Sequence, residues 1–273
     1  MVISKFKDKI NAIHEQAKQA SSSAGVYIGN DTVLTRLYNS QIMYVDTRDA
    51  SETPHLIMDG YWEINVTSLV EQLASQGGLM VDVGSTYGYF ALIAGNSGAD
   101  RVACIEANPV YEDYIRKNLT VNNVPDNWFV EISATGAKAG TTKLFIEGDD
   151  WNSASTQQSG GKEKVAEVEV KTLDTILAEN DATEVSVLKI DIEGMEEETY
   201  QGMSETIANS PNLKLLIEFS PENYKDAKGF FSKIQEDFST IQVMPQGDQL
   251  YPVNSYADIE KYADNWMMVL AEK

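Results

Sequence analysis

Acidic and glycine residues at a fixed spacing follow a short apolar stretch of the chain. Residues 79–83 predict a buried strand that contains Asp82, and Gly84 and Gly88 bracket the turn that follows it. A strand that ends in glycines and leads into a helix brings bare backbone amides close to a ligand. The spacing D-x-G-x-x-x-G differs from the dinucleotide-binding pattern G-x-G-x-x-G. An acidic residue before the first glycine favours a ligand with an ammonium group over one with a pyrophosphate.

A second carboxylate ends the next predicted strand. Residues 101–106 form this strand, and Glu106 is its last residue. In doubly wound sheets a carboxylate at this place accepts hydrogen bonds from ribose hydroxyls. Asn108 and Pro109 then open a helix that runs to about Asn122. Two carboxylates and a glycine turn together describe a pocket for a nucleoside that carries an amino acid, which is the chemistry of S-adenosylmethionine.

A third group of polar residues ends a later apolar strand at residues 185–190. Asp191 and Glu193 follow this strand and are candidate bases, and Lys189 lies inside it. Lys189 either points into the site or pairs with a carboxylate such as Glu218. Asp191, Glu193 and Glu218 also offer the hard oxygen ligands that suit Mg²⁺, although Lys189 can neutralise them instead. No metal ligand is therefore assigned, and Glu196 is interpreted as a helix N-terminal acid.

Four blocks of the chain resemble S-adenosylmethionine-dependent methyltransferases of the FkbM family. The most specific is the pattern K-x-D-x-E-G-x-E, and the resemblance covers about residues 55 to 220. The blocks are Gly60–Glu63, Val81–Phe90 followed by Glu106, Asn152–Ser155 leading to Val170–Asp174, and Leu188–Glu196.

The resemblance implies O-methylation of a sugar hydroxyl on a glycan, or of a natural product, with S-adenosylmethionine as methyl donor. It places Trp62 and Glu63 over the cofactor. Asp191, Glu193 and Lys189 are the expected catalytic residues, and Trp151, Asn152 and Glu218 the expected acceptor contacts. The expected cofactor-binding residues are Glu63, Asp82, Gly84, Ser85, Gly88, Glu106, Ala107, Ala134 and Asp191.

Strands that alternate with helices predict the elements that must position these residues. The pattern indicates an α/β fold with a doubly wound, mostly parallel sheet, in which ligands bind beyond the carboxyl ends of the strands. This is the Rossmann-like fold of class I methyltransferases. Residues 142–146 and 165–170 alternate like an antiparallel hairpin inserted into that fold, with a polar loop at 148–164. Further strands are expected at residues 128–132 and 213–219, and at 241–244 and 266–270 on the sheet edge.

The start of the chain predicts an extension of the main domain. Apolar residues recur at steps of three and four over residues 3–20, which indicates an amphipathic helix. It is expected to pack on its own domain, and a homodimer seam is the alternative. Residues 1–75 are interpreted as a helical cap and residues 76–273 as the cofactor-binding domain, together forming one compact unit. His55 in the cap is a weak candidate base.

Composition limits the classes of partner. The 273 residues have a net charge of −21, which opposes binding to nucleic acids and anionic membranes. No apolar run is long enough for a membrane span, and Cys104 is the only cysteine, so a cytoplasmic protein is expected. The rival functions are a nicotinamide-dependent oxidoreductase, a nucleic-acid methyltransferase, a methyltransferase of another small molecule, and a non-catalytic S-adenosylmethionine-binding protein.

Overall fold

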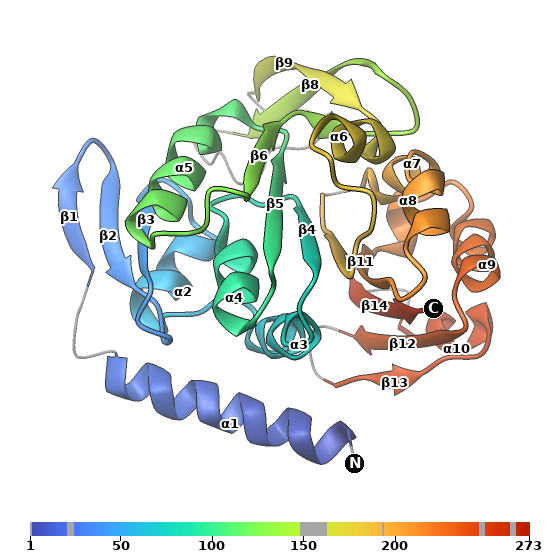
Figure 1. The fold of residues 1–273 in the computed structure, drawn as a ribbon, viewed down its shortest axis with the longest axis horizontal. Helices are drawn as coiled ribbons and strands as arrows, with labels where there is room; N and C mark the ends of the chain where they lie inside the picture. Colours follow the sequence, from blue (N-terminus) through green and yellow to red (C-terminus); the bar gives the residue numbers. More distant parts are fainter. Residues whose placement is uncertain (1, 21–24, 148–162, 193, 246–248, 263–265) are drawn as a thin grey trace.

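A twisted eight-stranded sheet forms the centre of the protein (Figure 1). The computed structural model describes residues 2–20, 25–147, 163–192, 194–245, 249–262 and 266–273. The strands, in spatial order, are β13 (Tyr251–Pro252), β12 (Thr240–Pro245), β14 (Met267–Glu272), β11 (Lys214–Phe219), β10 (Val187–Ile190), β4 (Leu79–Val83), β5 (Arg101–Glu106) and β6 (Phe129–Ile132).

Most of this sheet is parallel. The strands from β11 to β6 all run in one direction, while β14 is antiparallel to both β11 and β12. The expected doubly wound, mostly parallel sheet is therefore confirmed. The expectation that residues 266–270 lie at the sheet edge is wrong, because β14 is inserted between β11 and β12 and the short β13 forms the edge. The uninterrupted apolar side chains of β14 fit this position, since both of its faces are buried.

Helices cover the two faces of the sheet in separate groups. One face packs against α3 (Ile64–Ala74), α4 (Tyr89–Ser97) and α5 (Glu112–Val121), and this core also includes Ile13 and Ala17 of α1 (Val2–Ala20). The expected amphipathic N-terminal helix thus contributes to the core of its own chain. The opposite face packs against α6 (Leu173–Glu179), α7 (Glu196–Gln201), α8 (Ser204–Asn209), α9 (Ala227–Asp237) and α10 (Tyr256–Glu260).

A small antiparallel sheet and a short helix lie between α1 and α3. The sheet contains β1 (Val26–Gly29), β2 (Thr32–Arg36) and β3 (Ile42–Asp46), and the helix is α2 (Glu52–Met58). The sequence did not predict α2. Asp49 explains the helix: its carboxylate accepts the main-chain N–H groups of Ser51, Glu52 and Thr53 at 2.8–3.2 Å and so caps α2.

The predicted hairpin insertion forms a third sheet. Strand β9 (Glu163–Lys171) pairs antiparallel with β8 (Gly140–Glu147) and parallel with the short β7 (Ala134–Thr135). Residues 148–162 of the connecting loop, with Trp151 and Asn152, lie outside the described residues.

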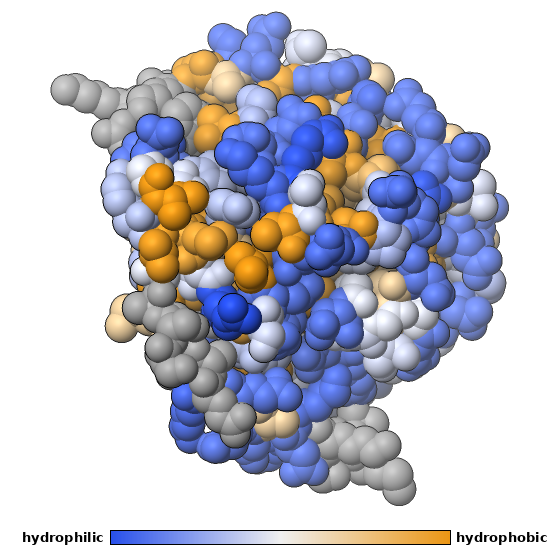
Figure 2. Space-filling view, turned by 60° about the vertical axis from the view of Figure 1, so that its left-hand side comes forward, coloured by the Kyte–Doolittle hydropathy of each residue, from blue (hydrophilic) through white to orange (hydrophobic). Residues whose placement is uncertain are grey.

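The surface that carries β1 is apolar in part. Figure 2 turns the side with β1 and β2 toward the reader and shows apolar surface bordered by hydrophilic surface. The exposed side chains of β1 are Val26, Tyr27 and Ile28. Within the described ranges, no helix combines the length and the apolar character that crossing a membrane requires.

Candidate active site

A cavity of about 840 Å³ opens at the carboxyl ends of the central strands. Residues from the ends of β4, β5, β10 and β11 line it, together with residues from α2 and the turn before α3. Most of the predicted site residues are among them, namely Glu63, Gly84, Ser85, Glu106, Ala107, Ala134, Lys189, Asp191 and Glu218. Asp82 and Gly88 are not among the lining residues.

Strand register explains why the polar side chains gather on one side of the sheet. Asp82 of β4 lies opposite Lys189 of β10 and opposite Cys104 of β5. Side chains two residues apart on a strand share a face, so Glu106 points to the same side as Cys104. Asp82, Lys189 and Glu106 therefore face the helical layer that contains α3 and α4.

The turn after β4 is held by main-chain contacts. Gly84 has φ +83°, and a Cβ at this position would lie 1.9 Å from the carbonyl oxygen of Asp191. The Ser85 hydroxyl donates to the carbonyl of Asp82 at 2.7 Å and accepts the N–H of Ile105 at 3.1 Å. Glycine is thus required at position 84 because the ends of β4 and β10 approach closely, and Gly88 has φ +78°, which also favours glycine.

Glu106 is tied to both turns that surround it. Its Oε2 accepts the N–H of Thr86 at 2.9 Å, and its Oε1 accepts the N–H of Asn108 at 2.8 Å. Burial raises the pKa of Glu106, while these backbone hydrogen bonds oppose the rise. The side chain is 8% exposed and lines the cavity, so its carboxylate is presented in a fixed orientation.

Asp82 is a buried carboxylate whose hydrogen-bonding capacity is unused. The residue is fully buried, and neither carboxylate oxygen accepts a hydrogen bond from the described residues. Burial raises the pKa of Asp82 to about 7, although the Lys189 charge on the neighbouring strand opposes this rise. A buried carboxylate without hydrogen bonds is costly, so a group that donates to Asp82 is favoured at this place.

Lys189 is the central cation of the site. Its Nζ lies 3.0 Å from Oδ2 of Asp191 and 4.6 Å from the centre of the Phe90 ring. Burial alone lowers the pKa of Lys189, but the charges of Asp191, Asp82 and Glu63 outweigh it and raise the pKa above its usual range. Of the two alternatives left open by the sequence, Lys189 both lines the cavity and pairs with a carboxylate, which is Asp191 and not Glu218. Glu218 accepts the Ser220 hydroxyl at 3.2 Å.

The last acid of the K-x-D-x-E-G-x-E pattern has a structural role. Glu196 is 1% exposed, and its Oε1 accepts the N–H groups of Ile192 and Gly194 at 3.1 and 3.2 Å. Its Oε2 accepts the hydroxyl of Tyr224 at 3.1 Å. Glu196 therefore shapes the turn that follows Asp191, in agreement with its interpretation as a helix N-terminal acid.

Several expected site features are not among the described residues that line the cavity. Glu193, like Trp151 and Asn152, lies outside the described residues. His55 pairs with Asp59 at 3.0 Å and does not line the cavity. Among the described residues, no group of three acidic, histidine or cysteine side chains has the geometry of a metal site. The structure therefore gives no support to Mg²⁺.

Other residues line the cavity without having been predicted. Ser51 and Glu52 come from the start of α2, Trp266 from the start of β14, and Tyr111 from the turn before α5. Burial, with the charge of Asp49 next, raises the pKa of Glu52 well above its usual value. The sequence signal for Glu52 was weak because it depends on recognising Asp49 as the cap of α2.

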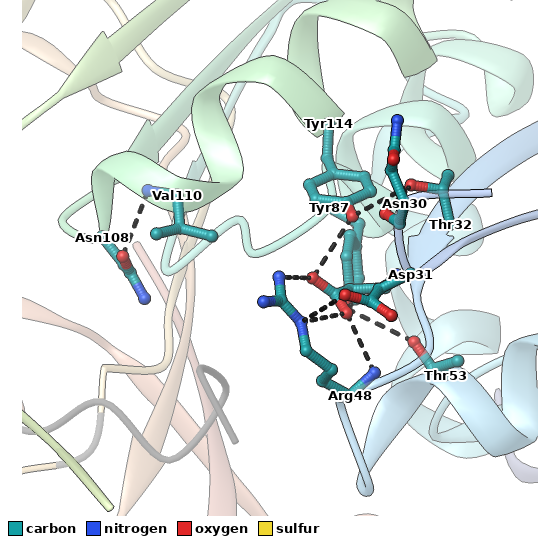
Figure 3. Close-up of polar contacts among 10 residues, drawn as sticks. Asn30, Asp31, Thr32, Arg48, Thr53, Tyr87, Asn108, Val110 and Tyr114 are labelled. Carbon is teal, nitrogen blue, oxygen red and sulfur yellow. Dashed lines mark hydrogen bonds and ion pairs between the residues drawn. The ribbon is translucent and has the colours of Figure 1, made fainter. Parts of the chain in front are cut away.

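A polar network surrounds Asp46 at the end of β3 (Figure 3). The Arg48 side chain forms two hydrogen bonds with the carboxylate of Asp46, from Nε to Oδ1 at 2.9 Å and from Nη2 to Oδ2 at 2.6 Å, and the Arg48 main-chain N–H adds a third to Oδ1 at 2.9 Å. The Tyr114 hydroxyl donates to the same carboxylate at 3.2 Å, and the N–H of Asp46 donates to the Tyr87 hydroxyl at 3.3 Å. Burial alone raises the pKa of Asp46, but the hydrogen bonds from Arg48 outweigh it and lower the pKa. The network joins β3 to α5 and to the glycine turn.

The match of the chain to a protein-family model identifies its family. Residues 82–263 match the model of the methyltransferase FkbM domain, which is more than half of the chain. The chain belongs to the FkbM methyltransferase family. The resemblance noted in the sequence is thereby confirmed, and the domain is of the S-adenosylmethionine-dependent methyltransferase kind. No curated protein sequence matches the chain.

Solved structures resemble the FkbM domain at low identity. A putative S-adenosylmethionine-dependent methyltransferase from Streptococcus mutans has a TM-score of 0.51 and 11% identity, over 90% of this chain and 57% of that one. Methyltransferase FkbM from Methylobacillus flagellatus KT has a TM-score of 0.44 and 17% identity, over 70% of this chain and 42% of that one. An O-methyltransferase from Bacillus cereus in complex with SAH has a TM-score of 0.44 and 12% identity, over 82% of each chain.

The similarity to the Streptococcus mutans structure is evidence for the fold only. With the strand order and the antiparallel β14, it confirms the class I methyltransferase fold expected from the sequence. The chain spans 42% and 57% of the lengths of the first two related structures.

The site residues suit the cofactor of the family. Asp82 has two buried oxygens that accept no hydrogen bond from the described residues, which fits a partner with an ammonium group. Glu106 presents a buried carboxylate to the cavity, which fits ribose hydroxyls. The hydrogen-bond-accepting chemistry of these two carboxylates therefore agrees with S-adenosylmethionine.

Proposed function

We propose that this FkbM-family enzyme methylates a hydroxyl oxygen of a small-molecule or glycan acceptor. When bound, S-adenosylmethionine supplies an electrophilic methyl group on a good leaving group. The observation that carries the proposal is Asp191, which lines the cavity at the carboxyl end of β10 and is held by Lys189 at 3.0 Å. A fixed carboxylate at this place can orient an acceptor hydroxyl and remove its proton.

In this proposal Lys189 positions the base, and the buried carboxylates bind the cofactor. Lys189 stays protonated, because the carboxylates around it raise its pKa, so it acts by holding Asp191 and not as a base. Asp82 and Glu106 bind the amino-acid and ribose parts of the cofactor, and the turns at Gly84, Ser85, Gly88, Ala107 and Ala134 surround it. Residues 1–75 act as a cap that supplies Glu63 to the cavity.

The test separates cofactor binding from catalysis. Calorimetry with S-adenosylhomocysteine should show saturable binding to the wild type and to Asp191→Ala. Methyl transfer should fall roughly 100- to 10,000-fold in Asp191→Ala, the range that general-base groups contribute. Asp113→Asn, which removes an exposed carboxylate paired with Lys117, is the control and should keep the wild-type rate. Wild-type turnover in Asp191→Ala would exclude Asp191 as the base.

A further inference from the structure

One wall of the cavity is strongly acidic. We call it the acidic wall; it consists of Glu52, Glu63, Asp191, Glu218 and Glu222. Among the described lining residues, Lys189 is the only basic side chain, and it is already paired with Asp191. The wall therefore has an excess of negative charge after this pairing.

The members of the acidic wall come from distant parts of the chain but meet in space. Ile190 of β10 lies opposite Ile217 of β11, so Asp191 and Glu218 follow at adjacent positions on the two strands. Glu52 of α2 lies within electrostatic reach of Glu63, Lys189 and Asp191. The cap and the end of β11 thus contribute charge to the same region of the cavity.

An unused hydrogen-bonding group beside this wall points to a ligand. Tyr111 lines the cavity and is 2% exposed, and its hydroxyl has no hydrogen-bond partner among the described residues. Burial raises the pKa of Tyr111, the neighbouring Tyr87 adds to the rise, and the charges of Asp49, Glu52 and Glu106 contribute less. Because an unsatisfied buried hydroxyl is costly, a polar ligand group is favoured at this place.

Aromatic rings complete the acceptor side of the cavity. Trp62 and Trp266, both half-buried, line it together with the acidic wall. The face of a tryptophan ring attracts a cation. A carboxylate nearby can form an ion pair with the same cation. Aromatic rings and carboxylates in one cavity are the chemistry that recognises an ammonium group.

We propose that the acceptor is a hydroxyl compound that also carries a protonated amine, and that the acidic wall binds this amine. The inference rests on the proposed methyl transfer and adds the class of acceptor. A carboxylate- or phosphate-bearing acceptor is disfavoured, because like charges repel in a partly desolvated cavity. The acidic wall selects the acceptor by charge, while Asp191 acts on its hydroxyl.

The experiment compares sugars that differ mainly in charge. Calorimetry of protein saturated with S-adenosylhomocysteine measures binding of glucosamine, of N-acetylglucosamine, which lacks the positive charge, and of glucuronic acid, which has a negative one. Glucosamine should bind about tenfold more tightly than N-acetylglucosamine, as expected for one charge-assisted contact, and glucuronic acid should not saturate. The preference should shrink at high salt concentration.

Single variants assign the preference to the acidic wall. Glu218→Gln keeps the side-chain shape and removes one charge, so it should reduce glucosamine affinity several-fold and leave that of N-acetylglucosamine unchanged. The control is Glu198→Gln, which removes an exposed charge of α7 outside the cavity and should change neither affinity. The folding of each variant is checked by its unchanged binding of S-adenosylhomocysteine.

The outcomes separate this inference from the proposed function. If S-adenosylhomocysteine binds but glucosamine binds no better than N-acetylglucosamine, or not at all, amine recognition is overturned while the proposed methyl transfer stands. If glucuronic acid binds most tightly, the acidic wall does not select by charge. Failure of S-adenosylhomocysteine to bind the folded wild type would overturn the proposed function itself.

Discussion

Two walls of the cavity are built in different ways. The glycine-turn wall, with Gly84, Ser85, Thr86 and Glu106, is fixed by hydrogen bonds to the main chain within a short stretch of sequence. The acidic wall combines two groups of side chains, Glu52 and Glu63 in one and Asp191, Glu218 and Glu222 in the other, and more than a hundred residues separate the two groups along the chain. The first wall therefore depends on backbone geometry and the second on the relative placement of whole elements, so changes in the two walls should have different consequences.

The largest difference is expected from adding one methyl group to the glycine-turn wall. In Gly84→Ala the new Cβ would meet the Asp191 carbonyl, and φ +83° is unfavourable for alanine. We expect unfolding free energy to fall by about 3–5 kcal/mol in urea denaturation. Gly140→Ala is the control, because nothing lies within 4 Å of a Cβ at that position. Equal stability of the two variants would refute the proposed backbone constraint.

A smaller effect is expected when the glycine-turn wall keeps its backbone geometry but loses one hydrogen-bond acceptor. Glu106→Gln replaces one carboxylate oxygen by an amide group that cannot accept an N–H of Thr86 or Asn108. Affinity for S-adenosylhomocysteine should fall roughly 10- to 100-fold by calorimetry. Glu112→Gln, on the exposed surface of α5, should leave this affinity unchanged. A wild-type affinity in Glu106→Gln would show that the carboxylate does not bind the ribose.

The pH dependence of stability and of cofactor binding tests the role of Asp82, which lies beside the glycine turn. Burial raises its pKa to about 7 in the folded state, above its value of about 4 in the unfolded chain. Folding of the unliganded protein should therefore lose stability as pH rises from about 4 to 7. Binding of S-adenosylhomocysteine should instead strengthen, by about tenfold between pH 6 and 8, because ionised Asp82 pairs with the ammonium group.

Asp82→Asn provides the comparison for this prediction. The variant cannot ionise at this position, so the pH dependence of stability should weaken in thermal unfolding, and the rise of affinity with pH should be lost in calorimetry. If Asp82→Asn keeps the full rise of affinity with pH, another group is responsible.

The smallest effect is expected at the polar network around Asp46. Arg48→Met removes both side-chain hydrogen bonds to Asp46, whose side chain is 3% exposed, while Arg48 itself is 40% exposed. Because Arg48 is partly solvated, we expect a loss of about 1–2 kcal/mol of unfolding free energy. Binding of S-adenosylhomocysteine should stay unchanged. Arg116→Met breaks an exposed pair with Glu112 and should cost less than half of that loss.

The two walls also differ in how far the sequence predicts them. The turn after β4 and the end of β5 are local, so spacing alone indicated Asp82, Gly84 and Glu106. The acidic wall required knowledge of which distant elements meet: Glu52 depends on an unrecognised helix, and Trp266 on the inserted strand β14. Lys189 and Asp191 are two residues apart on one strand, so the sequence allowed their pairing but could not choose between Asp191 and Glu218.

The position of β14 has a consequence for biosynthesis. This strand fills the gap between β11 and β12, and it carries Met268 into the cavity beside Glu218. Until residue 272 has left the ribosome, β11 and β12 each have an open edge that can pair with another chain. The cavity of a nascent chain is therefore incomplete until β14 has been synthesised. A chain truncated within β14 keeps open strand edges, which expose it to aggregation and to degradation by proteases.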